Sequence, residues 1–92
     1  MIQVHIFVSG QVQGVGYRAF TIHIARKMDI KGWTRNLSDG RVEIVAQGPR
    51  EKINLFTKKL WHGSMLSEVT GVVLDHEEMG DEYESFDKMP TF

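Results

Sequence analysis

The chain has 92 residues, of which 41% are hydrophobic and 25% are charged, and it contains no cysteine. This length predicts one domain spanning residues 1–92, and the composition is that of a globular protein rather than a disordered one. The lack of cysteine excludes disulfides, thiolate metal sites and cysteine nucleophiles. We find no signal peptide and no apolar run near the roughly 20 residues of a membrane helix, so we expect a cytoplasmic protein with no membrane partner.

The net charge of −1 is unevenly distributed along the sequence. Up to Ser67 there are ten basic and four acidic residues, whereas from Glu68 onward there is one basic residue against eight acidic ones. The basic part can attract a small anion. The acidic part is better explained as a solvated edge that discourages aggregation. Strong nucleic-acid binding would require a larger basic excess, so we expect no nucleic-acid partner.

Alternating apolar and polar residues at the start of the chain predict a strand with one buried face. Its apolar positions are Ile2, Val4, Ile6 and Val8. A helix is predicted from Tyr17 to Met28, because its apolar residues recur at helical spacing. The buried stripe of this helix comprises Phe20, Ile24, Ala25 and Met28. Thr21, Arg26 and Lys27 are expected to face outward.

Two extended runs follow the first helix, from Ile30 to Leu37 and from Arg41 to Gly48. Asp39-Gly40 lies between them and is a strong signal of a hairpin turn. These runs are therefore predicted to form the second and third strands. The core-facing residues of the third strand are Val42, Ile44 and Ala46.

The second half of the chain begins with Pro49, which suits the first turn of a second helix. The buried stripe of this helix is Ile53, Phe56 and Leu60, and its end is expected near His62 and Gly63. Val69 to Leu74 is predicted to be a fourth strand. The segment from Tyr83 to Phe92 is compatible with an irregular tail or a short edge strand.

This order of elements predicts an α+β protein with a ferredoxin-like β-α-β-β-α-β sandwich. The expected sheet is antiparallel, with both helices on one face. Many unrelated functions use this fold, so the topology does not decide the function.

The segment between the first strand and the first helix is rich in glycine, and it reads Gly10-Gln11-Val12-Gln13-Gly14-Val15-Gly16-Tyr17-Arg18. Glycine permits positive φ angles, and a helix that begins here directs unpaired N–H groups into the bend. Such a bend can hold a phosphate or an oxyanion, and Arg18 adds a permanent charge. The segment matches neither the P-loop nor the dinucleotide-binding fingerprint.

A second polar segment, Gly32-Trp33-Thr34-Arg35-Asn36, places Asn36 at the end of the second strand. In a ferredoxin-like sheet the first strand lies beside the third, which pairs with the second. The ends of the first and second strands therefore meet at one rim. We expect Arg18 and Asn36 to face one small pocket there.

Both segments resemble the two signature sequences of the acylphosphatase family. Gly10 to Arg18 resembles the first signature. The second signature is similar to the segment from Gly32 to Asn36 together with Gly40, Val42 and Gly48, which follow it. The interval of 18 residues between Arg18 and Asn36 is also similar. The chain departs from the family at Thr34, where Val or Ala is usual, and this difference concerns packing rather than chemistry.

The resemblance implies hydrolysis of the carboxyl–phosphate bond of an acyl phosphate to a carboxylate and inorganic phosphate, with no metal, cofactor or covalent phosphoenzyme. It implies that Arg18 binds the phosphoryl group and that Asn36 positions the attacking water. Backbone N–H groups of the loop would hold the phosphate oxygens, and the residues concerned are Gln13, Gly14, Val15, Gly16 and Tyr17. We expect this enzyme to be a monomer.

Two other functions stay open on the same fold. An RNA-binding module would need aromatic residues on the exposed face of both central strands, but only Phe7 is available. A non-catalytic anion sensor would keep the glycine-rich loop and lose turnover. The histidines lack the spacing of a metal site. Tyr17 and Trp33 are expected to shield the rim of the pocket.

Overall fold

The computed structural model describes all residues, 1–92. The strands are β1 (Ile2–Gln11), β2 (Lys31–Asn36), β3 (Val42–Gly48), β4 (Glu68–Glu77) and β5 (Phe86–Lys88). The helices are α1 (Tyr17–Lys27) and α2 (Arg50–His62). The predicted order of the first six elements is confirmed, and the segment whose structure was open contains the short strand β5.

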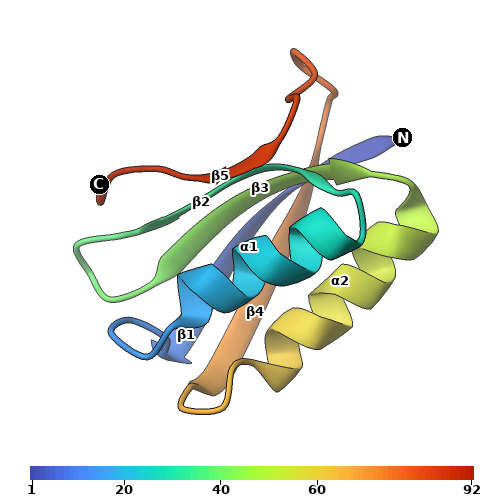
Figure 1. Cartoon of the computed structure of the whole chain (residues 1–92). Helices are drawn as coiled ribbons and strands as arrows, with labels where there is room; N and C mark the ends of the chain where they lie inside the picture. Colours follow the sequence, from blue (N-terminus) through green and yellow to red (C-terminus); the bar gives the residue numbers. More distant parts are fainter.

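The five strands form one sheet in the order β4-β1-β3-β2-β5. Figure 1 shows α1 and α2 side by side over one face of this sheet. The pairs among β1 to β4 are antiparallel, as predicted. Strand β5 instead runs parallel to β2, so the complete sheet is mixed.

The hydrophobic core lies between the helices and the sheet. Val4, Ile6 and Val8 of β1 are buried there, as are the residues predicted for β3 and the predicted stripe of α2. Ile2, at the start of β1, is only partly buried against this core. Phe86 of β5 is buried as well and meets the Phe56 ring edge to face, with 6.2 Å between centroids. Burial of one such side chain contributes about 1.5–3 kcal/mol. Phe86 therefore anchors the short strand β5 to the body of the protein.

The prediction that Thr21 faces outward is wrong. Thr21 is fully buried on the core side of α1, and its hydroxyl donates a hydrogen bond to the Tyr17 carbonyl oxygen at 2.9 Å. This bond within the helix satisfies the hydroxyl, so a threonine is tolerated in the apolar stripe. Thr34 is likewise buried, and its hydroxyl donates to the carbonyl oxygen of Glu43 at 3.2 Å.

The sheet face opposite the helices carries a polar network around Glu43. This carboxylate is buried and accepts a hydrogen bond from Arg35 Nε at 2.6 Å, while His5 Nε2 lies 2.5 Å from its other oxygen. Trp33 is on the same face, with the Arg35 guanidinium 4.9 Å from its ring centroid. The expectation that Trp33 shields the pocket rim is therefore wrong, because its place in β2 directs it away from the helices.

Acid is expected to weaken the fold through Glu43. Burial alone would raise the pKa of Glu43, but the hydrogen bonds from Arg35 and His5 outweigh burial and lower it. A carboxyl group with a lowered pKa stabilises the fold above its unfolded value, about 4.5, and this contribution is lost as the pH falls through the lower folded value. Urea unfolding between pH 3 and 7 should show this loss.

The variant Glu43→Gln should flatten the pH dependence of the free energy of unfolding below pH about 4.5. The control Glu51→Gln alters an exposed glutamate in the first turn of α2 and should keep the wild-type dependence. Identical pH profiles for Glu43→Gln and the wild-type protein would show that Glu43 does not carry the effect.

Candidate active site

The ends of β1 and β2 lie at the same level of the sheet. Val42 of β3 pairs with Val8 of β1 on one side and with Asn36 of β2 on the other. In Figure 1 the loop between β1 and α1 and the turn between β2 and β3 lie at the same end of the molecule. The topology therefore brings the two polar segments of the sequence to one rim.

The Gln13 side chain fastens the glycine-rich loop to the turn between β2 and β3. Its amide nitrogen donates to the carbonyl oxygens of Leu37 at 2.8 Å and of Arg41 at 2.9 Å. Because Leu37 directly follows Asn36, these bonds hold the loop beside the end of β2. The sequence suggested a backbone role for Gln13, and its side chain has this second, structural role.

Removing this link should loosen the loop relative to Asn36. For Gln13→Ala we expect kcat/KM for an acyl phosphate to fall about tenfold, since small misplacements of reacting groups are costly. The free energy of unfolding should fall by about 1–2 kcal/mol, for two partly buried hydrogen bonds. The control Gln11→Ala changes an exposed side chain at the end of β1 and should leave both quantities unchanged. Wild-type activity in Gln13→Ala would argue against the link.

Backbone N–H groups of the glycine-rich loop are free of partners in the chain. No N–H group from Gln13 to Ala19 donates to a backbone oxygen, and the first such bond runs from Phe20 to the Gly16 carbonyl oxygen at 3.0 Å. Gly14 and Gly16 have φ angles of 73° and 76°, which other residues rarely adopt. Consecutive N–H groups in such a turn form a concave donor surface that suits an anion.

A cavity of about 320 Å³ adjoins this loop and the first turns of α1. It is lined by Val12, Gly14, Gly16, Tyr17, Arg18, Ala19, Ile22 and Lys88. This volume is in the range of small-molecule sites. The lining combines backbone donors, an apolar wall and two cationic side chains, so the cavity suits an anion that carries an organic group.

Arg18 is half-buried in the first turn of α1 and takes part in no ion pair. Its charge adds to the positive end of the helix dipole instead of neutralising it. This arrangement is unfavourable for the helix alone and favourable for a bound anion. Arg18 therefore lies where the sequence placed it, at the junction of the loop and α1.

Asn36 lies at the end of β2 with its side-chain oxygen Oδ1 buried and without a hydrogen-bond partner. Its backbone is held by the last residue of the sequence, because the Phe92 N–H donates to the Asn36 carbonyl oxygen at 3.0 Å. The Arg35 guanidinium also lies 4.3 Å from the centroid of the Phe92 ring. Asn36 is not among the residues that line the 320 Å³ cavity, but the Gln13 link places the loop beside it.

Comparison with known proteins identifies the relatives of this chain. Residues 4–88 match the family model described as Acylphosphatase. The chain belongs to the acylphosphatase family. It is 41% identical to an acylphosphatase of Bacillus velezensis over 86 residues, covering 94% of this chain and 96% of the relative. It is 45% identical to one from Archaeoglobus fulgidus over 87 residues, covering 95% and 97%.

A solved structure agrees with this assignment. The crystal structure of acylphosphatase from Bacillus subtilis has a TM-score of 0.94 and 37% sequence identity, covering 97% of this chain and 99% of that one. Acylphosphatases are hydrolases of acid anhydrides, so the family is one of enzymes, and it acts on small acyl phosphates. No helix of this chain has both the length and the apolar character needed to cross a membrane.

In this acylphosphatase fold the expectation that the Tyr17 side chain shields the rim of the pocket is wrong. Its side chain is 1% exposed, and its hydroxyl donates to the Leu60 carbonyl oxygen of α2 at 2.8 Å. Burial raises the pKa of this hydroxyl, so it stays a proton donor. Tyr17 therefore ties the start of α1 to α2, while its place at the loop end keeps its N–H near the cavity.

Val15 and Gln13 do not line the cavity, in contrast to Gly14, Gly16, Tyr17 and Arg18. The Val15 carbonyl oxygen instead accepts a hydrogen bond from the Ser64 hydroxyl at 3.3 Å. This bond supports the loop from the segment that follows α2. Gln13 and Val15 therefore hold the loop in shape, while their N–H groups, like those of the residues that border the cavity, have no backbone partner.

Four residues of the cavity were not identified from the sequence: Val12, Ala19, Ile22 and Lys88. Ala19 and Ile22 follow from the phase of α1, once Tyr17 and Thr21 are known to face the core. Lys88 had no signal in the sequence, because it lies 70 residues after Arg18 and arrives through the pairing of β5 with β2.

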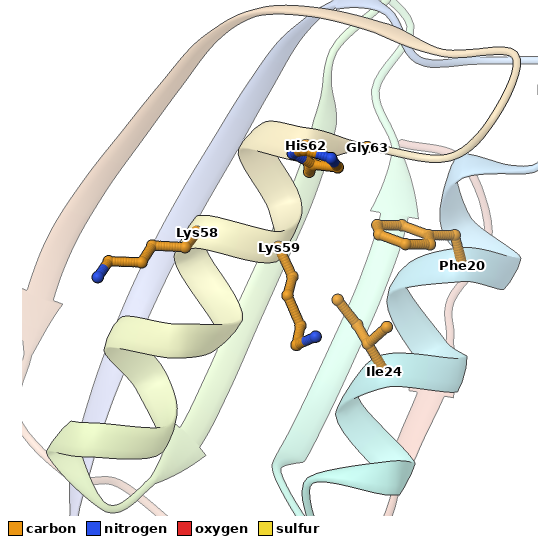
Figure 2. Close-up of a pocket in the computed structure, with 6 residues that line it drawn as sticks. All are labelled: Phe20, Ile24, Lys58, Lys59, His62 and Gly63. Atoms are coloured by element: carbon orange, nitrogen blue, oxygen red, sulfur yellow. The ribbon is translucent and has the colours of Figure 1, made fainter.

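A second cavity, of about 340 Å³, lies between α1 and α2 and is shown in Figure 2. It is lined by Phe20, Ile24, Lys58, Lys59, His62 and Gly63. In Figure 2 the Lys59 side chain extends toward Ile24, whereas Lys58 points away from the helix pair. The N–H of Gly63 is occupied by the Lys59 carbonyl oxygen, so this cavity lacks the free backbone donors of the first.

Proposed function

We propose that this chain hydrolyses acyl phosphates without a metal ion or cofactor, using Arg18 and Asn36 as catalytic residues. One observation carries the proposal: a run of free N–H groups next to Arg18 is fastened by Gln13 to the strand end that bears Asn36. The family membership supports the reaction class, and this geometry supports the roles of individual residues.

The glycine-rich loop is the phosphate-binding loop of this proposal. The N–H groups of Gln13, Gly14, Val15, Gly16 and Tyr17 hold the phosphoryl oxygens. The guanidinium of Arg18 binds two of them at once. Phosphoryl transfer passes through a loose transition state with charge on three equatorial oxygens. Donors fixed in place before the reaction stabilise that charge without reorganisation.

Asn36 holds the attacking water in line with the bond that breaks. Its Oδ1 lacks a partner in the chain and is shielded from solvent in this conformation, so it accepts a hydrogen bond from that water once the side chain turns toward the loop. The water oxygen bonds to phosphorus, and the bond between phosphorus and the acyl oxygen breaks with its electron pair on the leaving carboxylate. One water proton stays on the new oxygen and the other passes to a phosphate oxygen, which gives dihydrogen phosphate.

The proposed enzyme is a cytoplasmic monomer in which residues 1–92 form one catalytic domain. We assign it no nucleic-acid partner. The Phe7 ring on the open sheet face is stacked on His5 at 4.7 Å and covered by the Arg41 guanidinium at 4.8 Å. A base could stack there only by displacing both side chains, and β3 supplies no second ring.

Phosphate release from benzoyl phosphate by the purified protein tests the proposed function. We expect turnover that is unchanged by EDTA and competitively inhibited by inorganic phosphate. Binding of phosphate without turnover would instead identify an anion sensor. A rate equal to that of the Arg18→Ala variant would show that the turnover comes from a contaminant.

A further inference from the structure

Lys88 reaches the cavity from an element that does not carry the predicted catalytic residues. It pairs with Thr34 in the parallel register between β5 and β2, and the next N–H, of Met89, donates to the Thr34 carbonyl oxygen at 2.8 Å. Two residues earlier Phe86 is buried under the helices. The backbone at Lys88 is therefore held on both sides, while its side chain is exposed and borders the cavity.

Lys88 has no acidic partner in the structure, and neither has Arg18. Arg26 of α1 differs in this respect, because its guanidinium lies 3.5 Å from the Asp87 carboxylate of β5. Two cations therefore border one cavity without a neutralising carboxylate. Like charges so placed repel, and a ligand with more than one negative centre relieves that repulsion.

The cavity also extends beyond what a phosphoryl group occupies. Besides loop residues and Arg18, its lining includes Ala19 and Ile22 of α1 and Lys88 of β5. Its volume of about 320 Å³ equals roughly ten water molecules in the liquid. The apolar wall suits the carbon skeleton of an acyl group, and Lys88 then lies where a charge on that group would be recognised.

We infer that Lys88 determines specificity by binding a second negative charge on the acyl group, so that the favoured substrates are acyl phosphates of dicarboxylic or otherwise anionic acids. This inference rests on the proposed hydrolase function. The reaction itself is unchanged, because the same phosphorus–oxygen bond breaks and Lys88 touches only the part of the substrate that leaves.

Three substrates separate charge from size: benzoyl phosphate, 4-carboxybenzoyl phosphate and 4-carbamoylbenzoyl phosphate. The two para groups are similar in size, and only the carboxylate is charged. For Lys88→Met we expect kcat/KM for the 4-carboxy substrate to fall about three- to tenfold, as for loss of a partly screened charge pair. The other two substrates should change by less than about twofold, and Lys88→Arg should keep most of the wild-type preference.

The control is Lys59→Met, which removes an equal charge from the cavity of Figure 2 and should leave all three substrates unaffected. Added salt should also reduce the wild-type preference for the carboxylate. An equal loss for all three substrates, with weaker inhibition by inorganic phosphate, would overturn the inference and assign Lys88 to the phosphoryl group. An unchanged preference in Lys88→Met would overturn it too. Absence of turnover with every substrate would defeat the hydrolase function, and this inference with it.

Discussion

Replacing Arg18 by alanine should lower kcat/KM for benzoyl phosphate by about 10²–10³-fold, the usual effect of losing one fixed donor to a developing charge. The guanidinium is expected to supply two hydrogen bonds to the phosphoryl oxygens and a positive charge that no acidic side chain neutralises. Both contributions grow as charge develops in the transition state. The loss should therefore appear in kcat as well as in KM.

The fold should survive this change, because Arg18 takes part in no ion pair. Its positive charge also lies at the positive end of the α1 dipole, where it does not stabilise the helix. The control is Arg50→Ala, which removes an exposed arginine from the start of α2. This variant should have wild-type activity. Activity of Arg18→Ala within about threefold of that control would contradict the role assigned to Arg18, since one lost donor should cost far more.

Asn36→Ala should separate catalysis from binding. We expect kcat to fall about 10²-fold, because the attacking water loses the group that orients it. The inhibition constant for inorganic phosphate should change less than about twofold, since the loop and Arg18 hold the phosphate. A parallel loss of phosphate affinity would show that Asn36 binds the substrate rather than orients water.

Stability gives an independent readout for the same variant. A buried polar atom without a partner costs about 1–3 kcal/mol, and Asn36 Oδ1 is such an atom. Its removal should leave the free energy of unfolding unchanged or raise it, whereas a purely structural asparagine would lower it when replaced. Asn54→Ala, at an exposed position of α2, is the matched control and should change neither activity nor stability.

Local sequence signals were sufficient for the first six elements because each signal acts over a few residues, whereas β5 was left open. The alternation in β1 and the Asp39-Gly40 turn set the strands and the hairpin. Gly14 and Gly16 marked the loop that we propose binds the phosphoryl group, and the two segments that resemble the family signatures indicated the family. The buried face of α1 was predicted less accurately. Thr21 is polar, and its burial depends on the hydrogen bond that its hydroxyl donates within α1.

The assembly of the site depended on contacts between segments far apart in the sequence. The sequence alone determined that a glycine-rich turn leads into a helix beginning near Arg18, and that Asn36 ends a strand. Only the tertiary structure decided that the Gln13 side chain joins them, that Trp33 lies on the opposite face, and that Lys88 borders the cavity. The physical reason is that local conformation follows from backbone and side-chain preferences within a few residues, whereas strand order and parallel pairing emerge only when the whole sheet is assembled over its core.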